Sequence, residues 1–141
     1  MNNIGQARKL LKEENATLVA VKNNEIYISH NRGVAPILDK IDLNPQFFKG
    51  ASVADKVIGK AAAMLLHKYG TAEIHAVLVS KNALTYLENK SVTLTYDTAV
   101  DYIINRDKTD MCPMEKCVLN VDDKDEAETL IRDTREKLLK K

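Results

Sequence analysis

The residues best suited to chemistry lie in two places in the middle of the chain. Gly59 and Lys60 belong to an alanine-rich segment, while Ser80 and Asn82 follow an apolar run. Lysine can hold an anion or move a proton, and the start of a helix offers backbone N–H groups to an anion. The same residues are ordinary if Lys60 lies on a solvated face and Ser80 is only a helix N-cap. The set does not define a known reaction.

A second candidate is the tetrapeptide C-P-M-E that begins at Cys112. Pro113 would fix the start of a helix or turn and expose the Cys112 thiol beside unpaired N–H groups, which lower a thiol pKa. A nucleophilic or redox thiol needs a basic or cationic partner, and Glu115, Lys60 and Arg106 are the options. The alternative is a turn with a packed thiol.

Two further segments could bind an anion. Arg106 can hold a carboxylate or phosphate with its planar guanidinium, although Asn105-Arg106 also fits a helix C-cap followed by a solvated arginine. Arg32 and Gly33 predict a turn, or a loop that closes over a site. The catalytic candidates are therefore Lys60, Cys112 and Glu115. The ligand-binding candidates are Arg32, Gly33, Gly59, Ser80, Asn82, Asn105 and Arg106.

Composition narrows the class of protein. The 141 residues are 45% hydrophobic and 29% charged, which predicts a globular chain, and the formal net charge of +1 gives no case for a nucleic-acid partner. No apolar run approaches the ~20 residues that span a bilayer, and the N-terminus lacks a signal-peptide core, so we expect a cytoplasmic protein with no membrane partner. Cys112 and Cys117 are expected as free thiols, with a local redox disulfide as the alternative.

Hydrophobic spacing predicts the order of elements in one domain, residues 1–141. A short helix at 4–14 precedes a hairpin of strands 17–21 and 25–29, and residues 30–50 form an irregular crossover. Ser52 and Asp55 resemble a capping box, so a long helix is expected from there to Gly70. The later elements are a central strand at 74–79, a helix at 82–89, a strand at 92–96, a helix from Asp97 to 104, a polar loop at 105–111, an edge strand at 118–121 and a helix at 123–140 with Ala127, Leu130, Ile131 and Leu138 facing inward.

A hairpin followed by two strand–helix junctions resembles the cytidine-deaminase-like fold. The segments D-K-V-I-G-K-A-A-A (55–63), R-G-V-A-P (32–36), I-N-R (104–106) and C-P-M-E (112–115) are similar, as a set, to a small bacterial and archaeal family. That family is known only as a domain of unknown function with a deaminase-like fold. The resemblance covers nearly the whole chain up to about Val121, and it implies a fold and a shortlist of residues without an established reaction.

Zinc deaminases begin one helix with H-x-E or C-x-E and the next with P-C-x-x-C. Placed by element order, these motifs fall near 58–60 and 80–83, where neither keeps a zinc ligand and Lys60 takes the glutamate position. We therefore expect a three-layer α/β/α sandwich with a mixed sheet and deaminase-like topology, and no metal or cofactor.

The function expected first is binding of a small anionic or nucleotide-like ligand. A metal-independent enzyme using Cys112 with Lys60 or Glu115 is one alternative, and a structural or regulatory module is another. A homo-oligomer is expected in each case.

Overall fold

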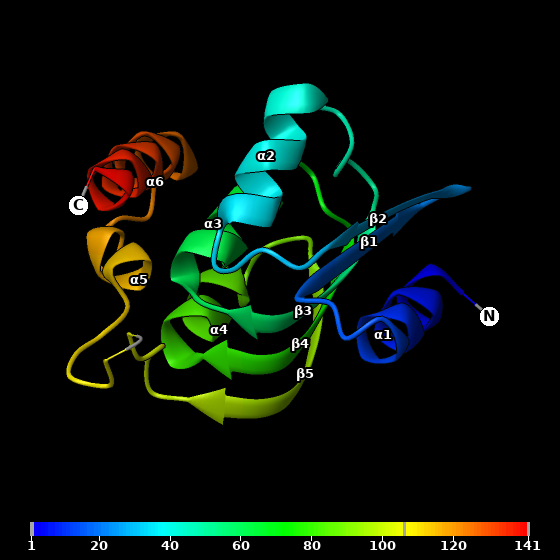
Figure 1. Cartoon of the computed structure of the whole chain (residues 1–141), viewed down its shortest axis with the longest axis horizontal. Helices are drawn as coiled ribbons and strands as arrows, with labels where there is room; N and C mark the ends of the chain where they lie inside the picture. The colour runs from blue at the N-terminus through cyan, green and yellow to red at the C-terminus, as the bar shows by residue number, and fades with distance from the viewer. Residues whose placement is uncertain (1, 106, 141) are drawn as a thin grey trace.

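A five-stranded mixed sheet forms the centre of the computed structural model, which describes residues 2–105 and 107–140 (Figure 1). Its strands are β1 (Leu18–Lys22), β2 (Glu25–Ser29), β3 (Ser52–Ile58), β4 (Glu73–Ser80) and β5 (Thr93–Val100). They lie in the order β2-β1-β3-β4-β5, with β1 antiparallel to both of its neighbours. Because β3, β4 and β5 are parallel, their carboxyl ends meet at one edge of the sheet.

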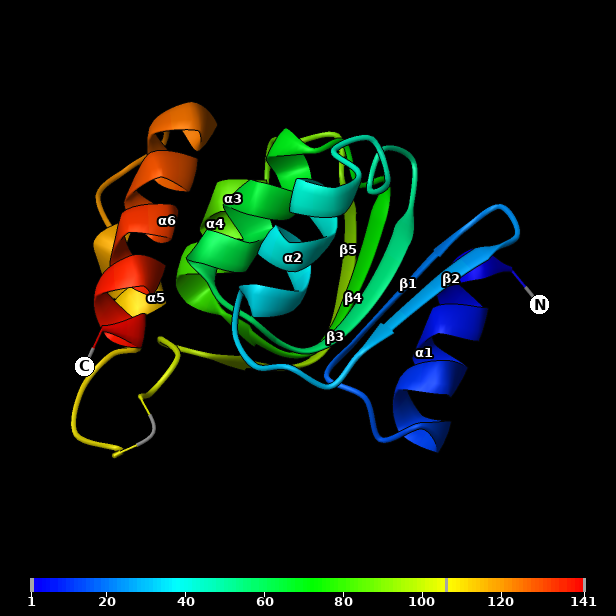
Figure 2. The ribbon, with the colours of Figure 1, turned by 45° about the horizontal axis from the view of Figure 1, so that its top comes forward.

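Helices flank this sheet on both faces (Figure 2). On one face α1 (Asn3–Glu13) packs on β1 and β3 and only touches β4, so it leaves β5 uncovered there. The other face is covered by α2 (Ala35–Leu43), α3 (Lys60–Lys68) and α4 (Lys81–Leu87). Outside α3 lie α5 (Pro113–Cys117) and α6 (Lys124–Leu139), which contact α3 and each other. The α/β class with a helix-flanked mixed sheet is confirmed.

The hydrophobic core has two parts. The larger lies between the sheet and the α2–α4 layer and includes Phe47, Phe48 and Leu66, with Ala127 and Ile131 reaching in from α6. The smaller lies beneath α1. Both parts consist mainly of buried apolar side chains, and their burial is the main source of stability for a domain of this size.

The long helix expected from Ser52 is wrong. Residues Ser52–Ile58 form strand β3, and the helix begins only at Lys60, with Gly59 as its N-cap. Ser52 and Asp55 are not a capping box, because the carboxyl oxygen Oδ1 of Asp55 accepts a hydrogen bond from the backbone of Val57 inside the strand. The C-terminal stop is confirmed, since Gly70 adopts a φ of +82° just after the helix.

The crossover at 30–50 is not irregular throughout. It contains α2, whose buried face is formed by Pro36, Ile37, Leu38 and Ile41. Proline at the start of a helix lacks only an N–H that would be unpaired there, so Pro36 does not interrupt the helix.

Two expectations near the C-terminal half are wrong. Asp97 does not cap a helix, because β5 continues through it to Val100, and the β-branched residues around it favour this strand. Residues 118–121 form a turn, in which Val118 is buried in the core, and not an edge strand.

The remaining elements agree with the sequence analysis. The first helix, the β1–β2 hairpin with Asn23 at a φ of 54°, the helix after Ser80 and the final helix are all confirmed within a few residues. Of the residues expected to face inward from the final helix, Leu138 is 40% exposed, so that part is wrong. Among residues 2–105 and 107–140, none of the helices has the length and apolar character needed to span a bilayer.

Candidate functional site

Glu115 is a buried carboxylate at the edge of the sheet where β3 and β4 end; it is only 1% exposed. Its Oε2 accepts a hydrogen bond from the backbone N–H of Lys60 at 2.8 Å and another from the Ser80 hydroxyl. Its Oε1 accepts from the backbone N–H of Ile103 at 2.7 Å. Because Lys60 begins α3 and Ser80 caps α4, one carboxylate from α5 ties the two helix starts together.

This arrangement fills the anion position that the sequence predicts at the two helix starts. The N-terminus of a helix carries partial positive charge and open N–H groups, which favour an anion. Here the anion is the carboxylate of Glu115, supplied by the chain itself. The structure thus brings Gly59, Lys60, Ser80 and Glu115 together, in an arrangement already satisfied without a ligand.

Lys60 is buried, at 6% exposure, so the solvated face considered for it is wrong. Its ammonium donates to the backbone carbonyl of Leu119 at 3.0 Å and lies 3.7 Å from the exposed carboxylate of Asp122. Lys56, which falls within the long helix predicted from Ser52 to Gly70, lies on β3 and donates to Asn15 Oδ1 at 2.9 Å. The Lys60 side chain therefore holds the segment that joins α5 to α6.

Gly59 is required by a close approach. A Cβ placed on it would lie 3.0 Å from Glu115 Oε2 and 3.1 Å from Ile103 Cγ1. We expect Gly59→Ala to lower the free energy of unfolding by about 1–3 kcal/mol, because the side chain must displace the carboxylate or the isoleucine. Urea unfolding measures this. Gly5→Ala, made near the start of α1, is the control and should be neutral or mildly stabilising. An equally neutral Gly59→Ala would contradict the close contact.

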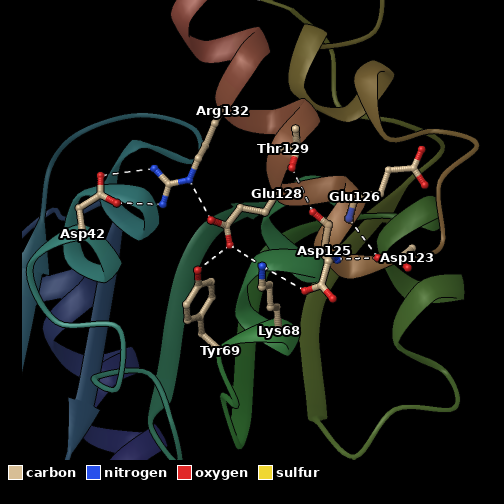
Figure 3. A network of polar contacts seen from close by, with 9 residues as sticks. All are labelled: Asp42, Lys68, Tyr69, Asp123, Asp125, Glu126, Glu128, Thr129 and Arg132. Atoms are coloured by element: carbon tan, nitrogen blue, oxygen red, sulfur yellow. Dashed lines mark hydrogen bonds and ion pairs between the residues drawn. The ribbon is translucent and has the colours of Figure 1, made fainter.

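The arm formed by α5 and α6 is held to the rest of the fold by a polar network (Figure 3). Glu128 accepts hydrogen bonds from Tyr69, Lys68 and Arg132, and Arg132 also pairs with Asp42 of α2 at 2.8 Å. Burial opposes ionisation of Glu128, but these donors outweigh it and lower its pKa to about 2. The network fixes the arm that carries Glu115.

Cys112 stands directly before α5, and Pro113 begins this helix as predicted. Its backbone N–H donates to the carbonyl of Ile103 at 2.6 Å, and its thiol is half-buried. No polar contact among the described residues joins this thiol to Lys60 or Glu115. Both cysteines are free, and burial raises the pKa of Cys117. A chemical role for Cys112 stays a prediction.

The other predicted ligand-binding residues make their contacts outside the cluster around Glu115. The side chain of Asn105 accepts from the backbone of Thr109 at 3.0 Å and shapes its own loop. Arg32 and Gly33 form an exposed turn before α2, and Asn82 is half-buried in the first turn of α4. Arg106 lies outside the described residues.

The structure also contains a groove that the sequence analysis missed. It lies between α1 and the uncovered face of β4 and β5 and has a volume of about 600 Å³. Its lining is rich in cations. The lining residues are Arg8, Lys9, Leu11, Lys12, Asn15, Lys56, His75, Val77 and Asp97.

His75 lies in the lining of this groove and is 4% exposed. Its Nδ1 is 2.7 Å from the hydroxyl of Thr95, and its Nε2 is 3.4 Å from Asp97 Oδ1. Arg8 and Lys12 are one turn apart on α1 and form no ion pair with any other described residue. Two like charges at this spacing on the first helix were the only sequence signal for the groove.

Within residues 2–105 and 107–140, no three histidine, cysteine or carboxylate side chains are grouped so that they could hold a metal ion. The described chain therefore offers neither the four ligands of a structural zinc site nor the three of a catalytic one.

Comparison with known proteins places the chain in a family. Residues 6–135 match the model of TM1506, described as a domain of unknown function (DUF1893). The crystal structure of a DUF1893 family protein (TM1506) from Thermotoga maritima is similar, with 32% sequence identity and a TM-score of 0.83 over 96% of this chain and 90% of that one. No curated protein matches significantly. The chain belongs to the TM1506 family, whose function is unknown.

Proposed function

We propose that this member of the TM1506 family binds a small phosphate-bearing ligand in the groove beside α1. The observation that carries the proposal is the convergence of Arg8, Lys12 and Lys56 on one groove. The single carboxylate in the lining, Asp97, already lies against His75. A bound anion would balance the positive charge of Arg8, Lys12 and Lys56.

The electrostatics of α1 support an anionic ligand. Arg8 and Lys12 lie one turn apart, where like charges disfavour the helix by about 0.2–0.5 kcal/mol. A bound phosphate would replace this repulsion with charge-assisted hydrogen bonds, and an arginine guanidinium can grip two phosphate oxygens at once.

The shape and lining of the groove support a ligand larger than phosphate alone. Its volume of about 600 Å³ falls within the range of small-molecule sites. Leu11 and Val77 add apolar surface beside the cations. A phosphate ester with a small apolar or planar body, including a nucleotide-like one, fits a groove lined by both cationic and apolar side chains.

We also propose that the scaffold is deaminase-like and works without zinc. The hairpin β1–β2 and the two junctions β3–α3 and β4–α4 support this relationship. The resemblance places the zinc motifs near 58–60 and 80–83, and the Glu115 carboxylate bridges Lys60 and Ser80 at these two junctions. In this proposal the Glu115 carboxylate has a structural role, because it joins the starts of α3 and α4.

The test measures binding of inorganic phosphate and of a nucleoside monophosphate by isothermal titration calorimetry. The double variant Arg8→Ala/Lys12→Ala is expected to weaken binding roughly tenfold for each cation removed. Lys124→Ala/Lys137→Ala removes two exposed cations of α6 with the same change in net charge and should bind as the wild type does.

Two outcomes contradict the proposal. One is equal loss of binding in both double variants, which would mean that only the net charge matters. The other is a loss in Lys60→Met while Arg8→Ala/Lys12→Ala binds normally, which would place the anion at the helix starts near Glu115.

A further inference from the structure

We infer that two copies of this chain pair antiparallel along β5 and join their sheets into one ten-stranded sheet. The outer edge of β5 is the feature that leads to this inference, because within residues 2–105 and 107–140 this strand pairs with β4 alone. An edge strand presents a row of unpaired backbone N–H and C=O groups to any chain that can pair with it.

The β5 edge has little of the usual protection against such pairing. Its eight residues, T-L-T-Y-D-T-A-V, include no proline, lysine or arginine and are rich in residues that favour strands. Its one charged residue, Asp97, lies 3.4 Å from His75 on the neighbouring strand. The edge strand on the other side, β2, has five residues. Long, uninterrupted edges are uncommon in chains that stay monomeric, since they invite association.

β5 is also exposed on both of its faces. Six of its eight residues are exposed, and only Leu94 and Val100 are half-buried. Large apolar side chains are exposed on the strand and in the residues that follow it, since Tyr96 is 46% exposed, Tyr102 41% and Ile104 56%. A second copy of β5 would cover part of this surface, and it would also form hydrogen bonds with the unpaired backbone groups on the outer edge of the strand.

Charge complementarity favours a second copy in the antiparallel orientation. Lys90 precedes the strand and lies over the Tyr86 ring. Asp101 follows the strand and forms an ion pair with Lys81 of its own chain at 2.8 Å. In an antiparallel pair, the basic start of one strand lies beside the acidic end of the other, and the two-fold symmetry makes this contact twice. A parallel pair would place like charges together.

The side chains also select a register. With the two-fold axis at Tyr96, the tyrosines of the two copies face each other and Thr95 lies opposite Asp97 of the second copy. With the axis at Asp97, two carboxylates would lie opposite each other, which is unfavourable. The register centred on Tyr96 is therefore the one we infer.

Sedimentation velocity on the full chain tests the inference. The wild type is expected to sediment as a dimer, and Tyr96→Lys as a monomer, because two ammonium groups would face each other across the axis. Ile26→Lys is a matched control: Ile26 has the same 46% exposure but lies on β2, so this variant should stay dimeric. Circular dichroism checks that each variant is folded.

Charge reversal keeps the test decisive if Tyr96→Lys fails to fold. Lys90→Glu and Asp101→Lys should each weaken the dimer roughly two- to tenfold, and the double variant should restore it. Lys81→Ala is the control for Asp101→Lys, because it breaks the ion pair that Asp101 forms within its own chain but leaves the Asp101 carboxylate in place, so it should stay dimeric. A monomeric wild type overturns the inference. So does a dimer that survives Tyr96→Lys but is lost in Ile26→Lys. Neither result depends on a ligand, so the proposed phosphate site is tested separately.

Discussion

Replacing Glu115 with alanine is expected to lower the free energy of unfolding by about 3–5 kcal/mol. The change leaves the buried N–H of Lys60 and the part-buried N–H of Ile103 without their acceptor. The Ser80 hydroxyl also loses a partner, although its oxygen still caps α4 by accepting from the backbone of Ala83. Each buried donor left unpaired costs about 1–3 kcal/mol. Urea unfolding measures the sum.

Two variants separate the lost hydrogen bonds from the lost side chain. Glu115→Gln keeps the shape but turns an amide NH₂ toward one of the donors, so it should recover only part of the stability. Glu136→Ala, at an exposed position of α6, should stay within about 0.5 kcal/mol of the wild type. Hydrogen exchange adds a local readout, because the Lys60 and Ile103 amides should exchange faster in Glu115→Ala. If Glu115→Ala is as stable as Glu136→Ala, Glu115 does not hold the junction.

Most elements of the fold could be predicted from the sequence, and the failures share a cause. The segment 52–58 has apolar residues at positions that suit a strand or a helix, and Ser52 with Asp55 imitates a helix start. Only the pairing of this segment with β1 and β4, which are distant in sequence, favours a strand over a helix. The same tertiary pairing carries β5 through Asp97, where local propensity suggested a cap.

The sequence predicts the residues of the candidate site but not the contacts between them. Gly59, Lys60, Ser80 and Glu115 are all candidates, yet Glu115 is expected there as a partner of the Cys112 thiol. Its contacts with Lys60 and Ser80 join positions 55 and 35 residues apart, which no local pattern encodes. The basic groove exists because α1 covers only part of its sheet face, and that depends on where the helix docks.

The second large effect concerns Asp55, a carboxyl buried within β3 at 5% exposure. Burial raises its pKa to about 8, because the loss of hydration outweighs the hydrogen bonds from the backbones of Val57 and Lys56. The folded protein therefore keeps this carboxyl protonated near neutral pH. In the unfolded chain the group ionises near its ordinary pKa of 3.8.

The sign of the pH dependence follows from this difference. Since folding raises the pKa of Asp55, its contribution to stability is complete below about pH 4 and is lost as the pH rises to about 8. Across this window the unfolded chain releases a proton that the folded chain retains, so ionisation favours unfolding. Above about pH 8 both states are ionised, and the penalty is constant.

Asp55→Asn removes this titration while keeping the shape and an oxygen that can accept from the Val57 backbone. We expect the free energy of unfolding of the variant, relative to the wild type, to rise by on the order of 5 kcal/mol between about pH 4 and about pH 8. Near pH 4 the variant should be no more stable than the wild type, because the amide adds a buried donor without a partner. Urea unfolding at several pH values measures the difference, with Asp133→Asn on the exposed side of α6 as the control for losing one carboxylate. A difference between Asp55→Asn and the wild type that stays constant with pH would show that Asp55 ionises normally in the fold.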